Sequence, residues 1–162
     1  MRQIVLLIFL LNFLAGTSQQ IPRWKADSLL RYEERSSGIT VINFWATFCK
    51  PCVEEIPHFM DVADRHVSEG VSLILVSLDL PDVYPGNLKA FIKKRKYRYP
   101  VYWLDESNAD YFLPRIDTSW TGSIPSTMIL NRKTGYRKFI ESSLSEKELE
   151  EEIHVALIAN KK

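Results

Sequence analysis

The sequence is poor in the side chains that bind soft metals, with two cysteines and three histidines among 162 residues. A structural zinc site needs four ligands, which are usually drawn from these two residue types. The cysteines, Cys49 and Cys52, stand three positions apart. The histidines have no paired spacing; they are His58, His66 and His154. This shortage of ligands argues against zinc, and we expect no metal or other cofactor.

An excess of one charge is also missing. The 21 Lys and Arg side chains face 20 Asp and Glu side chains, for a formal net charge of +1 at pH 7. A near-neutral domain gives no sign of binding a polyanion. The basic cluster at residues 93–98 is short and is interpreted as the solvated end of a helix. We therefore do not expect nucleic acid as a partner.

No apolar run reaches the roughly 20 residues that a membrane-spanning helix needs. The mostly apolar stretch at residues 4–14 follows one early cation, Arg2, and precedes small and polar residues at positions 15–18. This layout is typical of a secretory signal peptide. We expect a signal peptide at residues 1–18 and one domain at residues 19–162. An uncleaved N-terminal tether and a buried N-terminal helix are the alternatives.

Hydrophobic patterns predict an α/β domain. Continuous β-branched and aromatic runs predict buried strands at residues 39–45 and 71–78. An apolar stripe at helical spacing predicts a long helix between them, over residues 49–67, and a glycine-containing loop predicts a hairpin of residues 127–130 with 136–140. The other expected elements are helices at residues 23–38, at residues 87–95 and from residue 145, a strand-like piece at residues 101–104, and an irregular or briefly helical stretch at residues 105–122. This order predicts a central mixed sheet with helices on both faces.

The cysteine pair opens the expected long helix directly after a buried strand. Side chains at positions i and i+3 of a helix lie close enough for a disulfide. The helix N-terminus stabilises a thiolate at Cys49, which lowers its pKa below the ordinary ~8.5 of a free cysteine. Cys49 is therefore the expected nucleophile, and Cys52 the more buried, resolving thiol. A zinc half-site and an inert structural disulfide are the competing interpretations, although so short a loop adds little stability.

An acidic pair follows the cysteines on the same helix. On a helical wheel Glu54 points away from the apolar stripe, whereas Glu55 lies at its border on the side of Cys52. A half-buried carboxyl beside a thiol would have a raised pKa and could exchange protons with Cys52. The residues alone leave open whether Glu55 does this or is a solvated surface acid.

Residues 39–152 resemble the thioredoxin superfamily and, within it, the exported TlpA-like and ResA-like thiol-disulfide oxidoreductases. The motifs that carry the resemblance are Asn43-Phe44-Trp45-Ala46, then Cys49 to Cys52 with Glu55 and Pro57, and later Gly122 with Ile124-Pro125-Ser126-Thr127. The resemblance implies a thioredoxin fold, which agrees with the order of elements read from the pattern.

The resemblance also implies roles for single residues. ResA-like proteins carry an active-site glutamate where this chain has Glu55, which is the expected proton relay, whereas cytoplasmic thioredoxins place a buried aspartate where this chain has Asn43. Pro125 is expected to be cis and to face the cysteine pair, with the backbone of Ile124 held ready for an extended substrate. The residues expected to bind substrate are Trp45, Lys50, Pro51, Ile124 and Pro125.

The expected function is exchange of the disulfide with cysteines of extracytoplasmic, for instance periplasmic, protein substrates, in the reducing direction. A membrane redox partner is expected to reset the pair, and the protein is expected to be a monomer. A copper(I) metallochaperone is the alternative, although no histidine or methionine is positioned near Cys49. A peroxidase of the peroxiredoxin type would use a lone peroxidatic cysteine, whereas here Pro51 lies inside a pair. The aromatics Trp45, Phe48 and Trp120 either rim the pair or pack in the core, and packing is the commoner fate of such residues.

Overall fold

The computed structural model describes residues 20–159. The expected signal peptide at residues 1–18 lies outside this range. Among the described residues, no helix has the length and apolar character needed to span a membrane.

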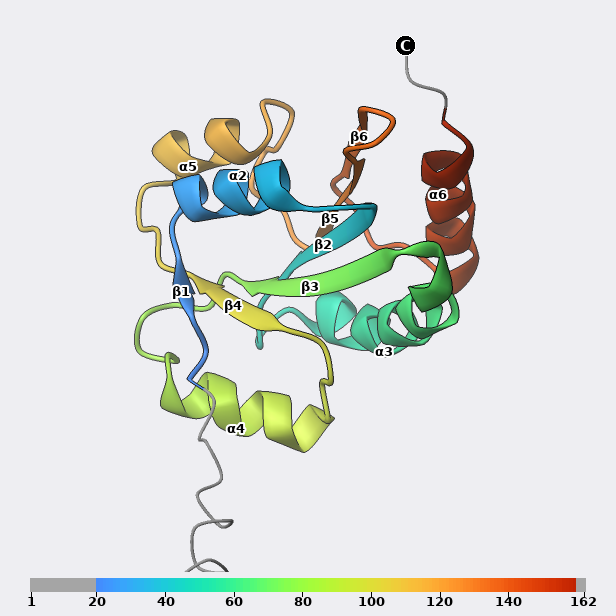
Figure 1. The fold of residues 1–162 in the computed structure, drawn as a ribbon. Coiled ribbons are helices and arrows are strands. Elements are labelled where there is room, and N and C mark those ends of the chain that lie inside the picture. The colour runs from blue at the N-terminus through green and yellow to red at the C-terminus, as the bar shows by residue number, and fades with distance from the viewer. Residues whose placement is uncertain (1–19, 160–162) are drawn as a thin grey trace, which may run out of the picture.

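Residues 20–159 contain one mixed sheet of six strands. The strands are β1 (Arg23–Trp24), β2 (Ile39–Trp45), β3 (Val71–Ser77), β4 (Val101–Leu104), β5 (Ser126–Asn131) and β6 (Tyr136–Ile140). Their order across the sheet is β1-β4-β3-β2-β5-β6 (Figure 1). The first four in that order are mutually parallel, and β5 and β6 each run antiparallel to their neighbour. Every residue of β2 is buried, as its continuous apolar run predicts.

Helices cover both faces of the sheet (Figure 1). In the described part of the chain the α-helices are α2 (Ala26–Arg35), α3 (Lys50–Arg65), α4 (Gly86–Arg95), α5 (Ala109–Ile116) and α6 (Glu146–Ile158). Val41 and Trp45 of β2 belong to an apolar layer with α3, α4 and α6. Ile42 and Phe44 belong to a second layer with α2 and α5. The alternation of side chains along β2 thus joins the sheet to both layers, and the predicted mixed sheet with helices on both faces is confirmed.

One expected element is corrected. Residues 23–24 form the edge strand β1, because Arg23 and Trp24 pair with Trp103 and Leu104 of β4, and the helix begins only at Ala26. The stretch expected to be irregular or briefly helical contains the short helix α5, whose buried Phe112 and Ile116 pack in the layer with α2. Both elements are held by tertiary contacts that short segments do not signal on their own.

Candidate active site

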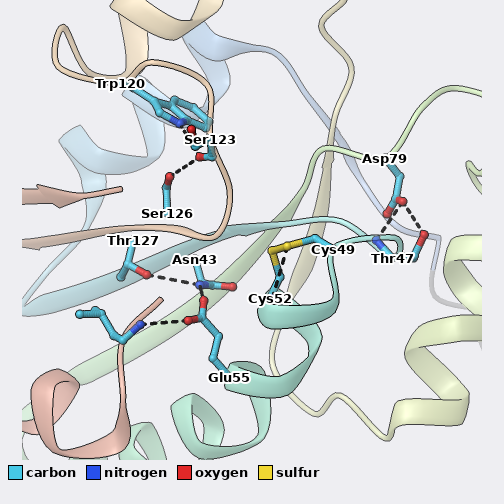
Figure 2. Close-up of a disulfide and its surroundings, with 11 residues drawn as sticks. Asn43, Thr47, Cys49, Cys52, Glu55, Asp79, Trp120, Ser123, Ser126 and Thr127 are labelled. Carbon is cyan, nitrogen blue, oxygen red and sulfur yellow. Dashed lines mark hydrogen bonds between the residues drawn. A yellow bond between two sulfur atoms is a disulfide. The ribbon is translucent and has the colours of Figure 1, made fainter. Parts of the chain in front are cut away.

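The two cysteines form a disulfide at the start of α3 (Figure 2). Cys49 is the N-cap residue of the helix, and its Sγ accepts a hydrogen bond of 3.3 Å from the backbone N–H of Cys52. The two Cα atoms lie 5.3 Å apart. Cys49 is 8% exposed, whereas Cys52 is completely buried. A partner sulfur can therefore reach only Cys49, and the N–H groups of the first helical turn face the sulfur that would carry negative charge after reduction.

Glu55 lies one helical turn after Cys52, and its side chain is buried at 3% exposure. Its Oε1 accepts a hydrogen bond of 2.8 Å from Asn43 Nδ2, and its Oε2 accepts one of 3.1 Å from the backbone N–H of Leu144 (Figure 2). Burial raises the pKa of Glu55 to about 7, although both hydrogen bonds act to lower it. A carboxyl group with a pKa in this range can take or give a proton near neutral pH.

Asn43 connects Glu55 to the opposite side of the site. Its amide lies on β2 and is fully buried; Nδ2 donates to Glu55 and also, at 3.3 Å, to Thr127 Oγ1 of β5. Its Oδ1 has no hydrogen-bond partner within the described residues. Three elements, α3, β2 and β5, therefore supply one buried polar group behind Cys52. Asn43 was expected only to stand where cytoplasmic thioredoxins place an aspartate, and its contact with Glu55 was not predicted.

The loop before β5 contains the proline that the resemblance marks. The Ile124–Pro125 peptide bond is cis, as the resemblance implies, and Pro125 is buried. Because Ser126 pairs with Phe44 near the end of β2, this loop lies at the same end of the sheet as the disulfide. Within the loop, Ser126 Oγ donates to the carbonyl oxygen of Ser123 at 2.6 Å (Figure 2).

A second carboxylate lies on the other side of the disulfide (Figure 2). Asp79 follows β3 and is 3% exposed. Its Oδ1 accepts hydrogen bonds from the backbone N–H of Thr47 at 3.0 Å and from the Thr47 hydroxyl at 2.6 Å, while Oδ2 accepts one of 2.8 Å from the Ser77 hydroxyl. Asp79 was not predicted as a site residue, because it lies in a loop without periodicity and far along the chain from the cysteines.

Trp45 does not reach the surface. It is fully buried, with its ring 5.3 Å from that of Tyr97 and 5.9 Å from that of Phe91. The expected substrate contact by Trp45 is therefore corrected, because it packs under α4. Trp120 also packs in the core, at 5% exposure, whereas Phe48 is 69% exposed directly before Cys49.

The other residues expected to bind substrate lie around Cys49 and the proline loop. Lys50 and Pro51 are exposed between the cysteines, and Lys50 forms an ion pair of 3.7 Å with Glu54. Ile124 is partly buried beside Pro125 and packs against both apolar layers. These four residues thus remain candidates for a contact surface.

Known proteins share this sequence pattern and this fold. A family model described as the AhpC/TSA family matches residues 18–135. The sequence is 33% identical over 97 residues to sporulation thiol-disulfide oxidoreductase A of Bacillus subtilis, which covers 56% of this chain and 58% of that protein. It is 26% identical over 127 residues to thiol-disulfide oxidoreductase ResA of Halalkalibacterium halodurans, which covers 78% of this chain and 66% of that protein. The chain thus spans less than two thirds of the length of either curated relative.

Solved structures include a similar arrangement of strands and helices. The crystal structure of a thioredoxin-related protein from Neisseria meningitidis serogroup B aligns with a TM-score of 0.60 and 26% sequence identity, over 74% of this chain and 85% of that one. StoA from Bacillus subtilis aligns with a TM-score of 0.55 and 26% identity, over 72% and 82%. The predicted thioredoxin fold is confirmed, and the chain belongs to the AhpC/TSA family.

Proposed function

We propose that the domain is a thiol-disulfide oxidoreductase that reduces disulfides of protein substrates through Cys49 and Cys52. One observation carries the proposal: a surface-reaching cysteine at a helix N-terminus is bonded to a fully buried one, and a carboxyl group with a pKa of about 7 lies one turn further on. The names of the relatives from Bacillus subtilis and Halalkalibacterium halodurans, both thiol-disulfide oxidoreductases, support the same activity.

The proposed reaction starts from the reduced pair. The Cys49 thiolate attacks one sulfur of the partner disulfide, so that a mixed disulfide forms and the other partner sulfur leaves as a thiolate, which takes up a proton. Cys52 then loses its proton and attacks Cys49 Sγ. The intramolecular disulfide forms, the mixed disulfide breaks, and the partner's second sulfur leaves. Two electrons have passed from this domain to the partner, whose disulfide is now a dithiol.

In this scheme Glu55 is the group that takes the proton from Cys52. A general base acts best when its pKa lies near the working pH, and burial brings Glu55 to that range. Asn43 and Leu144 hold its two oxygens through N–H donors, which suit the ionised state that receives the proton. In the reverse reaction the same carboxyl returns the proton to Cys52.

The proposed contact surface for the partner surrounds Cys49. Lys50, Pro51, Ile124 and Pro125 belong to it, and the exposed ring of Phe48 takes the place that Trp45 was expected to fill. An extended partner segment would lie along the backbone of Ile124 with its sulfur over Cys49.

The competing chemistries find less support in the site. The AhpC/TSA description does not by itself choose between disulfide exchange and peroxide reduction, but the bonded pair differs from the lone peroxidatic cysteine of a peroxidase. For a copper(I) metallochaperone, a third ligand near the pair would be a supporting observation. Residues 20–159 contain no group of three or more His, Cys, Asp or Glu side chains arranged to hold a metal ion.

The cellular setting completes the proposal. A signal peptide at residues 1–18, or an uncleaved tether made from the same segment, would deliver the domain to an oxidising compartment. A reducing domain there needs a supply of electrons, which a membrane-bound dithiol partner would provide by the same exchange chemistry. We propose that the domain acts as a monomer.

The first test is the equilibrium reduction potential of the Cys49–Cys52 pair in glutathione and dithiothreitol buffers. Alkylation and mass measurement of the two cysteines give the reduced fraction, and Cys49→Ser is the control. We expect a reversible two-electron couple near the thioredoxin value of about −270 mV. A couple near −120 mV, the approximate value for strong oxidants, would replace the reducing role by an oxidising one. A pair that does not interconvert would overturn the proposed activity.

A further inference from the structure

Asp79 fixes the turn that leads into Cys49. The backbone N–H of Cys49 donates to the carbonyl oxygen of Ala46 at 3.1 Å, which closes a turn with Thr47 in its middle. Asp79 binds both polar groups that Thr47 can donate, its backbone N–H and its hydroxyl, through the single oxygen Oδ1. The position of the turn before the nucleophile therefore depends on a carboxylate from another strand end.

Three further hydrogen bonds, to Ser77 and Trp103, hold Asp79 itself in place. Its Oδ2 accepts from the Ser77 hydroxyl at 2.8 Å, and its backbone N–H donates to the same Ser77 oxygen at 3.2 Å. Its carbonyl oxygen accepts from Trp103 Nε1 at 2.7 Å. Because Asp79 is 3% exposed, water can replace few of these contacts. The carboxylate is a rigid acceptor on the Cys49 side of the site.

The charge of this carboxylate also bears on Cys49. Its side-chain donors are neutral dipoles, which stabilise a negative charge but do not cancel it. Thr47 precedes Cys49 by two residues, so the carboxylate stays within roughly 10 Å of the Cys49 sulfur. At that separation two like charges still repel each other, and solvent at the half-exposed Thr47 weakens the repulsion without removing it. The helix N-terminus favours a Cys49 thiolate, and Asp79 opposes it.

We propose that Asp79 is a positioning residue for Cys49: it holds the Thr47 turn in place, and its charge disfavours the Cys49 thiolate, so that the couple stays reducing. This inference rests on the proposed function, since it concerns the same exchange reaction. The direction follows from linkage: any group that makes the thiolate less stable makes the reduced state less stable relative to the disulfide. The reduced domain then gives up its electrons more readily.

Asp79→Asn separates the two parts of the proposal. The amide retains Oδ1 as an acceptor for Thr47, and its NH₂ can donate to the Ser77 oxygen, so the turn is kept while the charge is lost. The matched control is Asp82→Asn, which removes the charge of an exposed acid in the same loop. For the reduced proteins we would measure the rate of Cys49 alkylation between about pH 4 and pH 10, in steps of ~1 pH unit. This range brackets the pKa of an ordinary thiol.

We expect the alkylation rate of Cys49 at pH 7 to rise about fivefold in Asp79→Asn, with its pH profile moved to lower pH. The equilibrium with glutathione should shift by a similar factor toward the reduced protein. Asp82→Asn should match the unchanged protein. A profile and an equilibrium in Asp79→Asn that match those of Asp82→Asn would overturn the proposed role of the charge, even if the melting temperature fell.

A second pair of variants tests the positioning of the turn and does not alter the charge. Thr47→Val removes the hydroxyl donor, and Thr47→Ser keeps it. We expect Thr47→Val to slow exchange with a protein disulfide several-fold, about 3- to 10-fold for one lost hydrogen bond, and Thr47→Ser to restore most of the rate. Equal rates in the two variants would overturn the positioning role. A pair that is inert in the unchanged protein would instead overturn the proposed function, and this inference with it.

Discussion

Two buried carboxyl groups flank the disulfide, and their surroundings differ. Glu55 lies behind Cys52, and Asp79 lies beside the turn before Cys49; each is 3% exposed (Figure 2). In the part of the chain that the structure describes, Glu55 receives one N–H donor on each oxygen. Asp79 receives three donors, two of them hydroxyl groups.

The difference shows how burial and hydrogen bonding divide the work of two similar side chains. With only two donors, the cost of burying a charge dominates at Glu55 and raises its pKa to about 7. Glu55 can therefore change its protonation state during turnover. Asp79 accepts from three donors, two of which belong to the Thr47 turn, and so it suits a fixed anchor. In the proposed reaction each cysteine thus has its own acid: Glu55 carries the proton of the resolving thiol, and Asp79 anchors the turn before the nucleophile.

The largest expected effect comes from removing the proton carrier. Glu55→Gln keeps the shape of the side chain but cannot take the proton of Cys52, so we expect resolution of the mixed disulfide to slow by about 100-fold or more at pH 7. The measurement is the decay of a mixed disulfide between Cys49 and a peptide, quenched with acid and followed by mass. Glu54→Gln, which removes an exposed acid from the same helix, is the control and should leave the decay unchanged. Equal decay in both variants would show that water or another group takes the proton.

The same carboxyl group should make stability depend on pH. The folded pKa of Glu55 is raised from 4.5 to about 7, so between these values the folded protein holds a proton that the unfolded chain has released. The stability that Glu55 contributes is therefore complete below pH 4.5. As the pH rises to about 7, the free energy of unfolding should fall by about 3 kcal/mol.

The measurement for this prediction is the free energy of urea unfolding of the oxidised protein at several values between pH 4.5 and pH 7.5. Glu55→Gln should lack this loss, and the difference between the two proteins isolates Glu55 from other groups that titrate in both. A constant difference across the range would contradict the raised pKa.

The sequence could predict the features that depend on neighbouring residues, but not those that depend on contacts between residues far apart in the chain. Strand β2 was predicted to the residue, because it is buried on both faces and so reads as one apolar run. Strand β1 was missed, because its two residues have no pattern of their own and are held by β4, about 80 residues later. The position of the cysteines at the start of α3 could be predicted, because the residues that mark the start of this helix are close to them in the sequence.

The same distinction between local and long-range contacts applies to the two carboxyl groups. The helical wheel placed Glu55 at the border of the apolar stripe and left its burial open, and its partner Leu144, 89 residues away, gave no signal. Asp79 gave no signal, since its contact with Thr47 spans 32 residues between two loops. Trp45 was wrongly expected to bind substrate, because the pattern of a strand end does not show which helix, here α4, will cover it.

A smaller effect should come from the amide that holds Glu55. The hydrogen bond from Asn43 lowers the pKa of Glu55, so Asn43→Ala should raise that pKa further and move the pH profile of mixed-disulfide resolution to higher pH. We also expect a loss of about 1–3 kcal/mol in the free energy of unfolding, because one oxygen of Glu55 loses its buried partner.

Thr127→Val is the control for that variant, since it removes the acceptor of the second hydrogen bond of Asn43 and leaves Glu55 untouched. It should cost stability but leave the pH profile in place. A profile that moves to lower pH in Asn43→Ala would mean that the amide does not favour the ionised form of Glu55.

The smallest expected effect lies on the other side of the disulfide. Ser77→Ala removes one of the three donors to Asp79, and the two from Thr47 remain. We expect the free energy of unfolding to fall by about 1 kcal/mol, and the pH profile of mixed-disulfide resolution to match that of the unchanged protein. The measurements are urea unfolding and the decay of the peptide adduct. Because the Ser77 hydroxyl donates only to Asp79 among the described residues, a shifted profile would mean that the anchor also acts on the proton transfer at Cys52, and that the division of work between the two carboxyl groups does not hold.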